Sequence, residues 1–176
     1  MNERLRRVRL GLLVAILATA AGCAADAGDD DDMTEEDEDE NLGVTSEALT
    51  ANEMEGRIIR AINDVRRSRS LPAVSGGACV DGFAERWAGR LVSTGTFRHQ
   101  DIGPINRRCN GSWAGEVLAG GAASITAKGW VDAWMASPSH RAILLTRRAD
   151  RVGVAVRTRP NGDRVIVADF IDRPNE

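Results

Sequence analysis

The sequence predicts a layered α+β domain. Two segments, 51–67 and 79–93, predict helices because their apolar residues recur at helical spacing. Two later segments, 151–158 and 164–171, predict paired strands because they flank a turn at 160–163, and valines alternate with small residues in the first of them. Helical segments that precede a terminal hairpin indicate the α+β class.

The first 22 residues have the features of a bacterial secretory signal. A start rich in arginine precedes the apolar run Leu10–Leu17, and small residues follow up to Cys23. The run is too short to span a membrane as a helix. The small pair before the cysteine resembles the lipobox of bacterial lipoproteins, in which Cys23 is lipidated; ordinary cleavage after Ala21 or Gly22 is the alternative. We expect lipidation at Cys23 and membrane anchoring, with the mature protein in the cell envelope on the extracytoplasmic side.

Residues 23–50 form an acidic segment with little to bury. Between Ala24 and Ala48 there are 12 acidic and no basic residues. Such a segment repels itself and stays disordered. It lacks the glycine-punctuated spacing of a calcium loop, so we interpret it as a tether to a domain at 51–173.

The remainder of the chain has the opposite charge. From Leu49 onward there are 19 basic and 13 acidic residues, and every base except Lys128 is arginine. One interpretation is a solvated surface that reflects codon bias, and the other is attraction to an anionic envelope polymer or lipid ligand. An exported protein without interleaved aromatic residues is not expected to bind nucleic acid.

Cys79 and Cys109 remain once Cys23 is assigned to the anchor. An even pair in an exported domain is expected to be a disulfide. The chain-entropy model gives such a bridge, which closes a loop of about thirty residues, roughly 3 to 4 kcal/mol of stabilisation. The spacing is too wide for a zinc knuckle.

The first predicted helix begins after Thr50, which can cap it. Its apolar stripe comprises Met54, Ile58, Ile62 and Val65. We expect its arginines to form a solvated face, which comprises Arg57, Arg60, Arg66 and Arg67. Gly, Pro and Asn between Ile102 and Ser112 predict an irregular loop.

The two histidines and one isolated glutamate are the candidate site. A predicted amphipathic helix within 129–145 stops at Ser137-Pro138, directly before His140. His99 follows the second helix, and Phe97 is expected to fix its direction. Glu116 lies in a short apolar segment, and burying a lone carboxylate is costly unless it is paired. We therefore expect these three residues to meet in one cleft.

Several landmarks occur in a familiar order. They are Phe97-Arg98-His99, Gly115-Glu116, the run 134–141, Val152-Gly153-Val154 and Asp169-Phe170. This set resembles the bacterial branch of the CAP superfamily (SCP domains, the cysteine-rich secretory, antigen 5 and pathogenesis-related proteins) over about 51–171. The resemblance implies a three-layer α-β-α sandwich with a small antiparallel sheet and a cleft lined by His99, Glu116 and His140. Val117 and Ile143 depart from the family pattern, where Asn is usual.

Four hypotheses of function follow. The first is binding of a divalent metal such as zinc, or of a small or lipid ligand, by His99, Glu116 and His140. The second is a metal-assisted, peptidase-like hydrolase in which Glu116 is the catalytic general base. A serine hydrolase built on Ser137 or Ser139 is disfavoured because a residue so near His140 in sequence is poorly placed to bond to it. In the last, the three residues form a hydrogen-bond network that only stabilises the fold.

Overall fold

The first helix, α1 (Ala51–Arg67), begins at a capping box. Thr50 accepts a hydrogen bond from the Glu53 amide, and the Glu53 carboxylate accepts one from the Thr50 amide.

The structure, a computed structural model, describes residues 49–173. The predicted signal 1–22, Cys23 and the acidic tether up to residue 48 lie outside the described residues.

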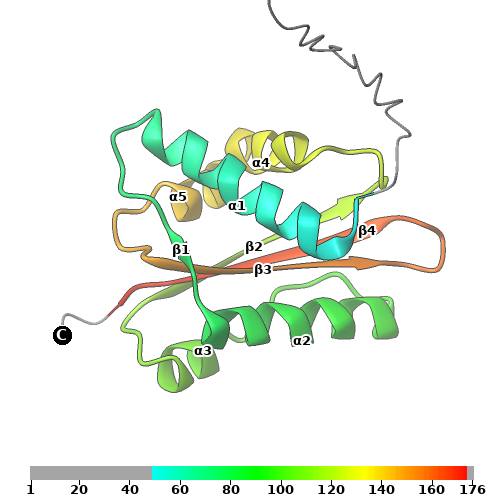
Figure 1. Cartoon of the computed structure of the whole chain (residues 1–176). Helices are drawn as coiled ribbons and strands as arrows, with labels where there is room; N and C mark the ends of the chain where they lie inside the picture. The colour runs from blue at the N-terminus through cyan, green and yellow to red at the C-terminus, as the bar shows by residue number, and fades with distance from the viewer. Residues whose placement is uncertain (1–48, 174–176) are drawn as a thin grey trace, which may run out of the picture. The chain divides into compact units, whose positions relative to one another are not determined.

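A four-stranded sheet forms the middle layer (Figure 1). Its strands are β1 (Ser75–Gly76), β2 (Ala114–Gly121), β3 (Arg151–Thr158) and β4 (Arg164–Ile171), in the order β1-β3-β4-β2. The predicted hairpin is present with the predicted bounds. The short β1 pairs in parallel with β3, so the sheet is mixed rather than purely antiparallel.

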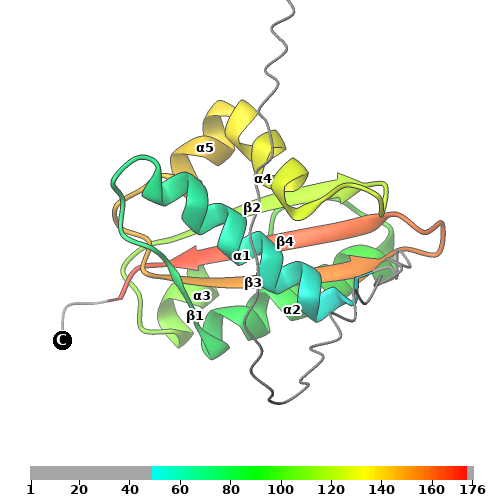
Figure 2. The same cartoon turned by 45° about the horizontal axis from the view of Figure 1, so that its top comes forward.

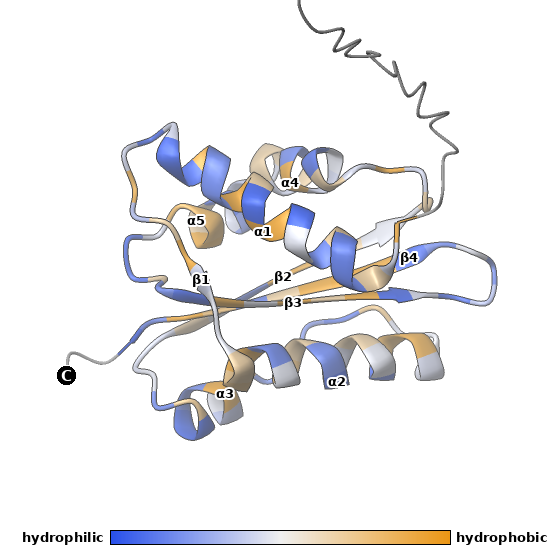
Figure 3. Cartoon of the chain, viewed as in Figure 1, coloured by the Kyte–Doolittle hydropathy of each residue, from blue (hydrophilic) through white to orange (hydrophobic). Residues whose placement is uncertain are grey.

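Helices cover both faces of the sheet. On one side lie α1, α4 (Ala127–Ala136) and α5 (Pro138–Leu144), and on the other lie α2 (Ala78–Thr94) and α3 (Gly103–Arg108) (Figures 1 and 2). The apolar residues of β3 and β4 face both layers (Figure 3). The three-layer α-β-α sandwich is therefore confirmed. None of the helices in residues 49–173 is long and apolar enough to cross a bilayer.

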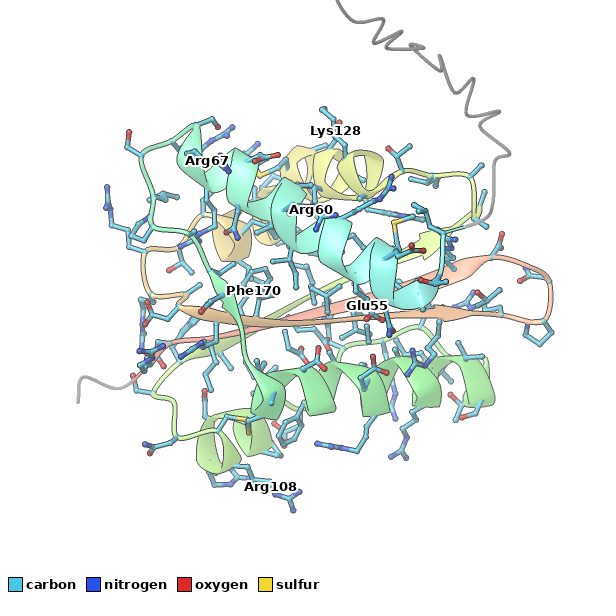
Figure 4. All side chains as sticks on the ribbon, in the orientation of Figure 1. Glu55, Arg60, Arg67, Arg108, Lys128 and Phe170 are labelled. Carbon is cyan, nitrogen blue, oxygen red and sulfur yellow. A yellow bond between two sulfur atoms is a disulfide. The ribbon has the colours of Figure 1, made fainter. Side chains whose placement is uncertain are left out.

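The prediction that Arg66 belongs to a solvated face is wrong. Arg57, Arg60 and Arg67 are exposed, and Figure 4 shows Arg60 and Arg67 on α1. Arg66 instead has 0% of its surface exposed. The physical reason is that the loops following α1 and α5 present backbone carbonyls to this position, which a guanidinium with five donors can satisfy.

Short helices occur in two places where none was expected. One lies in the predicted irregular loop at 102–112, and the other begins at Pro138, where a helix was expected to end. Within 102–112 the chain forms α3, because Pro104 lies in its first turn, where a missing amide donor costs nothing. Pro138 likewise opens α5 after ending α4, and Ser137 flanks both helices. A proline that stops one helix is therefore the first residue of the next.

Helix α2 approaches the sheet closely. A Cβ at Gly153 of β3 would overlap the backbone of Asp81 in the first turn of α2, so only glycine fits there. The predicted disulfide is confirmed: Cys79 near the start of α2 is bonded to Cys109 directly after α3. The bridge thus ties the second helical layer to the chain leading into β2.

Candidate functional site

Glu116 is the buried centre of the candidate site. It lies on β2 with its side chain 2% exposed. Antiparallel register places it opposite Asp169 of β4, which in turn lies opposite Gly153 of β3. Two carboxyl groups therefore occupy one cross-strand row, where apolar residues are the rule.

His99 supplies the partner that Glu116 was expected to need. Its Nδ1 lies 2.6 Å from Glu116 Oε1, and the histidine side chain is 57% exposed. Because both Glu116 oxygens also accept hydrogen bonds from Gln100, we assign Nδ1 of His99 as the donor. This assignment leaves Nε2 of His99 as the free ring nitrogen.

Gln100 connects the two carboxyl groups. Its backbone amide donates to Glu116 Oε1 at 3.2 Å, and its Nε2 donates to Glu116 Oε2 at 2.8 Å and to Asp169 Oδ2 at 2.8 Å. A single amide therefore orients Glu116 and, through it, His99. In the same region Trp87, on α2, donates from its indole to the Arg98 carbonyl and so fixes the start of this loop.

Asp169 is fully buried next to this network. Burial, and then the nearby Glu116, raise the pKa of Asp169 to about 8, whereas its bond from Gln100 acts in the opposite direction. The side chain is therefore mainly neutral at pH 7. Among the described residues its Oδ1 has no hydrogen-bond partner.

Gln100 and Asp169 were not among the predicted site residues. A signal for Asp169 existed, since it is a lone carboxylate in the apolar run 165–171, as Glu116 is in its own segment. No comparable signal marks Gln100, which lies in a polar loop.

His140 reaches the site from the opposite helical layer. It occupies the third position of α5, and its ring centroid lies 6.4 Å from that of His99, with the planes tilted by 57°. Burial, and then the proximity of His99, lower the pKa of His140 below its usual 6.5. The neutral imidazole, which is the form that binds metals, is therefore favoured at neutral pH.

An open cavity lies beside His99 and Glu116, and its lining does not include His140. Its volume is about 350 Å³, and its lining includes His99, Gln100, Glu116, Trp113 and Ile143 of α5. A larger hollow of about 510 Å³ lies elsewhere, at the N-termini of α1 and α4, and includes neither histidine.

Comparison with known proteins identifies the family. The sequence profile of the cysteine-rich secretory protein family (CAP) matches residues 59–170. The chain belongs to this family. No curated protein sequence matches it significantly.

Solved structures share the CAP fold with it. An outer surface protein from Borrelia burgdorferi has 22% identity and a TM-score of 0.62, covering 72% of this chain and 97% of its own. An extracellular SCP-domain protein from Bacillus anthracis has 20% identity and a TM-score of 0.60, covering 71% of this chain and 44% of its own. NaASP2, solved with Zn²⁺, has 12% identity and a TM-score of 0.51, covering 66% of this chain and 78% of its own.

The structure places His99, Glu116 and His140 near one another without forming a complete set of metal ligands. Within residues 49–173, no group of three or more His, Cys, Asp or Glu side chains is placed to hold a metal ion. Both oxygens of Glu116 accept hydrogen bonds from His99 or Gln100, so Glu116 contacts the Nδ1 side of the His99 ring. The serine hydroxyls of Ser137 and Ser139 lie 3.2 Å from one another, and neither bonds to His140 within the described residues.

Proposed function

We propose that this CAP domain binds a divalent metal ion such as zinc through His99 and His140. The observation that carries the proposal is the 2.6 Å contact between His99 Nδ1 and the buried Glu116. A metal-binding histidine commonly donates its second ring N–H to a carboxylate, which fixes the ring and raises its basicity. Glu116 and Gln100 provide that support here.

The chemistry of His140 supports the same proposal. Its lowered pKa keeps the imidazole neutral, and a metal requires a neutral ring nitrogen. NaASP2, a structural relative, was solved with Zn²⁺. With two imidazoles from the protein, the remaining coordination positions would be filled by water or by polar groups of a ligand in the adjoining cavity.

The proposal assigns Glu116 an orienting role rather than a catalytic one. A general base needs an oxygen that can reach a reacting water. Glu116 is buried, and its oxygens already accept three hydrogen bonds from His99 and Gln100. A bound metal would supply Lewis acidity at this cavity, while the residues of this chain bind and orient.

Calorimetric titration with zinc tests the proposal. In a Cys23→Ser background, the His99→Ala and His140→Ala variants should each lose measurable binding. Glu116→Gln should bind about 10- to 100-fold more weakly, because it removes a supporting carboxylate. The glutamine side chain of this variant has one acceptor oxygen, whereas His99 and Gln100 present three donors to this position. Binding should also weaken as the pH falls and His140 becomes protonated, and the lowered pKa of His140 moves this loss to a pH below that of an ordinary histidine.

The carboxylates before Leu49 can bind zinc weakly, so the titration needs a control that measures this background. The double variant His99→Ala/His140→Ala provides it, since it retains every carboxylate. Asp132→Asn, which removes an exposed carboxylate on α4, serves as the matched control and should bind like wild type. If wild type and the double variant bind zinc equally, the proposal is wrong and the network is structural.

We also propose that the CAP domain is held at the extracytoplasmic face of the envelope by a lipid on Cys23. The supporting observation is the basic, apolar and Ala21-Gly22-Cys23 sequence of the first 23 residues. After a high-salt wash, which removes electrostatic contacts with the bilayer, Cys23→Ser should be found in the soluble fraction by immunoblotting, whereas the wild-type protein stays in the membrane fraction. Cys79→Ser, which alters a disulfide cysteine instead, should leave the protein in the membrane fraction. A Cys23→Ser protein that remains there through high-salt washing would contradict the anchor.

A further inference from the structure

One end of the domain carries an unusual combination of aromatic and basic side chains. We call it the aromatic–arginine patch, and it comprises Trp87, Arg90, Phe97, Arg98 and Arg159. These residues come from the second half of α2, from the loop that follows it and from the β3–β4 turn. Their side chains make none of the hydrogen bonds to Glu116, which come from His99 and Gln100.

Aromatic rings hold the arginines in place. The guanidinium carbons of Arg90 and Arg98 lie 5.9 and 5.8 Å from the Trp87 ring centroid. Arg159 lies 5.8 Å from the Phe97 ring, and its Nε is buried without a hydrogen-bond partner in the described part of the chain. Stacking of this kind orders a guanidinium, and the exposed residues Arg90 and Arg98 keep N–H donors available to a phosphate.

The patch presents unpaired charge together with apolar surface. Phe97 is 51% exposed and is the only large apolar side chain between residues 49 and 173 that is exposed. Within the same residues, Arg90, Arg98 and Arg159 form no ion pair with a carboxylate. Asp163, in the adjacent turn, accepts a hydrogen bond from Asn161 instead.

The described chain begins at the same end of the sheet. Leu49 accepts a hydrogen bond from Arg164, the first residue of β4. Phe97 packs against Gly120, which pairs with the next residue of that strand, Val165. Figure 1 shows the end of α2, the β3–β4 turn and the start of α1 at this end of the molecule. The first described residue, Leu49, therefore lies at the same end of the sheet as the patch.

We propose that the aromatic–arginine patch docks onto a bilayer surface that contains anionic phospholipids. Ordered guanidinium groups without carboxylate partners suit lipid phosphates, which they can bind in a bidentate manner. The exposed apolar ring of Phe97 among them suits the boundary between headgroups and acyl chains, where apolar side chains of surface-bound proteins are buried. A soluble polyanion offers the phosphates or sulfates but no apolar phase for Phe97, which is why a bilayer is the better match.

Vesicle cosedimentation of the full chain carrying Cys23→Ser tests this inference, because it removes the predicted lipid anchor. Vesicles of phosphatidylcholine alone are compared with vesicles that also contain phosphatidylglycerol. Arg90→Gln/Arg98→Gln should weaken binding to the mixed vesicles by about 25-fold, on the basis of about fivefold for each basic residue near an anionic surface. Phe97→Ser should weaken it on the order of fivefold through lost apolar burial. Any contribution of residues 1–48 is the same in every variant.

A charge-matched control separates the patch from net charge. Arg107→Gln/Arg108→Gln removes two exposed arginines of α3, near the other end of the sheet, and Figure 4 shows Arg108 pointing away from the domain. It should retain nearly all binding, and thermal melting should show that all variants are folded. An equal loss in this control would overturn the proposal. The proposal would also be overturned if Phe97→Ser bound the mixed vesicles as tightly as the parent protein and polyphosphate released both proteins. That result would indicate a soluble polyanion as the partner.

Discussion

Replacing Arg66 with alanine is expected to lower the free energy of unfolding by about 3 to 5 kcal/mol, because several carbonyls lose a charged donor and a large buried side chain is removed. The Arg66 guanidinium donates to the carbonyls of Pro72, Leu144, Thr146 and Ala149, at distances from 2.7 to 3.2 Å. Removal leaves these acceptors without a donor and opens a cavity. Urea denaturation measures the loss as a lower midpoint.

The neighbouring arginine provides the matched control. Arg67 has a side chain that is 74% exposed, and it pairs with Asp64 on the surface of α1. Arg67→Ala should change the stability by less than about 0.5 kcal/mol, as is usual for exposed ion pairs. Equal effects at the two positions would contradict the structural role of Arg66.

Arg66 also bears on the candidate site. Leu144 is the last residue of α5, and His140 lies one turn earlier on the same helix. Arg66→Lys should therefore reduce zinc affinity as well as stability, because an ammonium cannot satisfy carbonyls spread over two loops. If the folded Arg66→Lys variant binds zinc as tightly as wild type, Arg66 supports the stability of the domain but not the position of His140.

Removing the disulfide is expected to cost about 3 to 4 kcal/mol, from the entropy of the unfolded chain that it constrains. Cys79 and Cys109 are separated by 30 residues, and that loop contains α2, α3 and His99. The variant Cys79→Ala/Cys109→Ala should melt at a clearly lower temperature in calorimetry. Reductant should lower the melting temperature of wild type similarly.

The double-alanine variant controls for other effects of the reductant, since its melting temperature should not change when reductant is added. Thiol titration of denatured wild type, in the Cys23→Ser background, should find no free thiol. Two free thiols, or a wild-type melting temperature indifferent to reductant, would show that the bridge does not form in the mature protein.

Local sequence determined the elements whose interactions are local. The capping residue and the spacing of Met54, Ile58 and Ile62 predicted α1 with its observed bounds, because capping and amphipathic spacing act within a few residues. The two strands of the hairpin were predicted for the same reason, since a turn at 160–163 fixes their register. The ordered motifs likewise indicated the CAP family from the sequence alone.

Tertiary structure decided which polar side chains are buried. Arg66 has the same local context as the exposed Arg67, and only the folded chain surrounds it with carbonyls from Pro72 and from residues 144–149. The sequence indicated that Glu116 needed a partner, because an unpaired buried carboxylate is costly. It could not indicate that Gln100 would join Glu116 to Asp169, since strands β2 and β4 meet only in the folded sheet. Hydrogen bonds between residues so distant in sequence depend on the whole packing of the layers, and no local pattern encodes them.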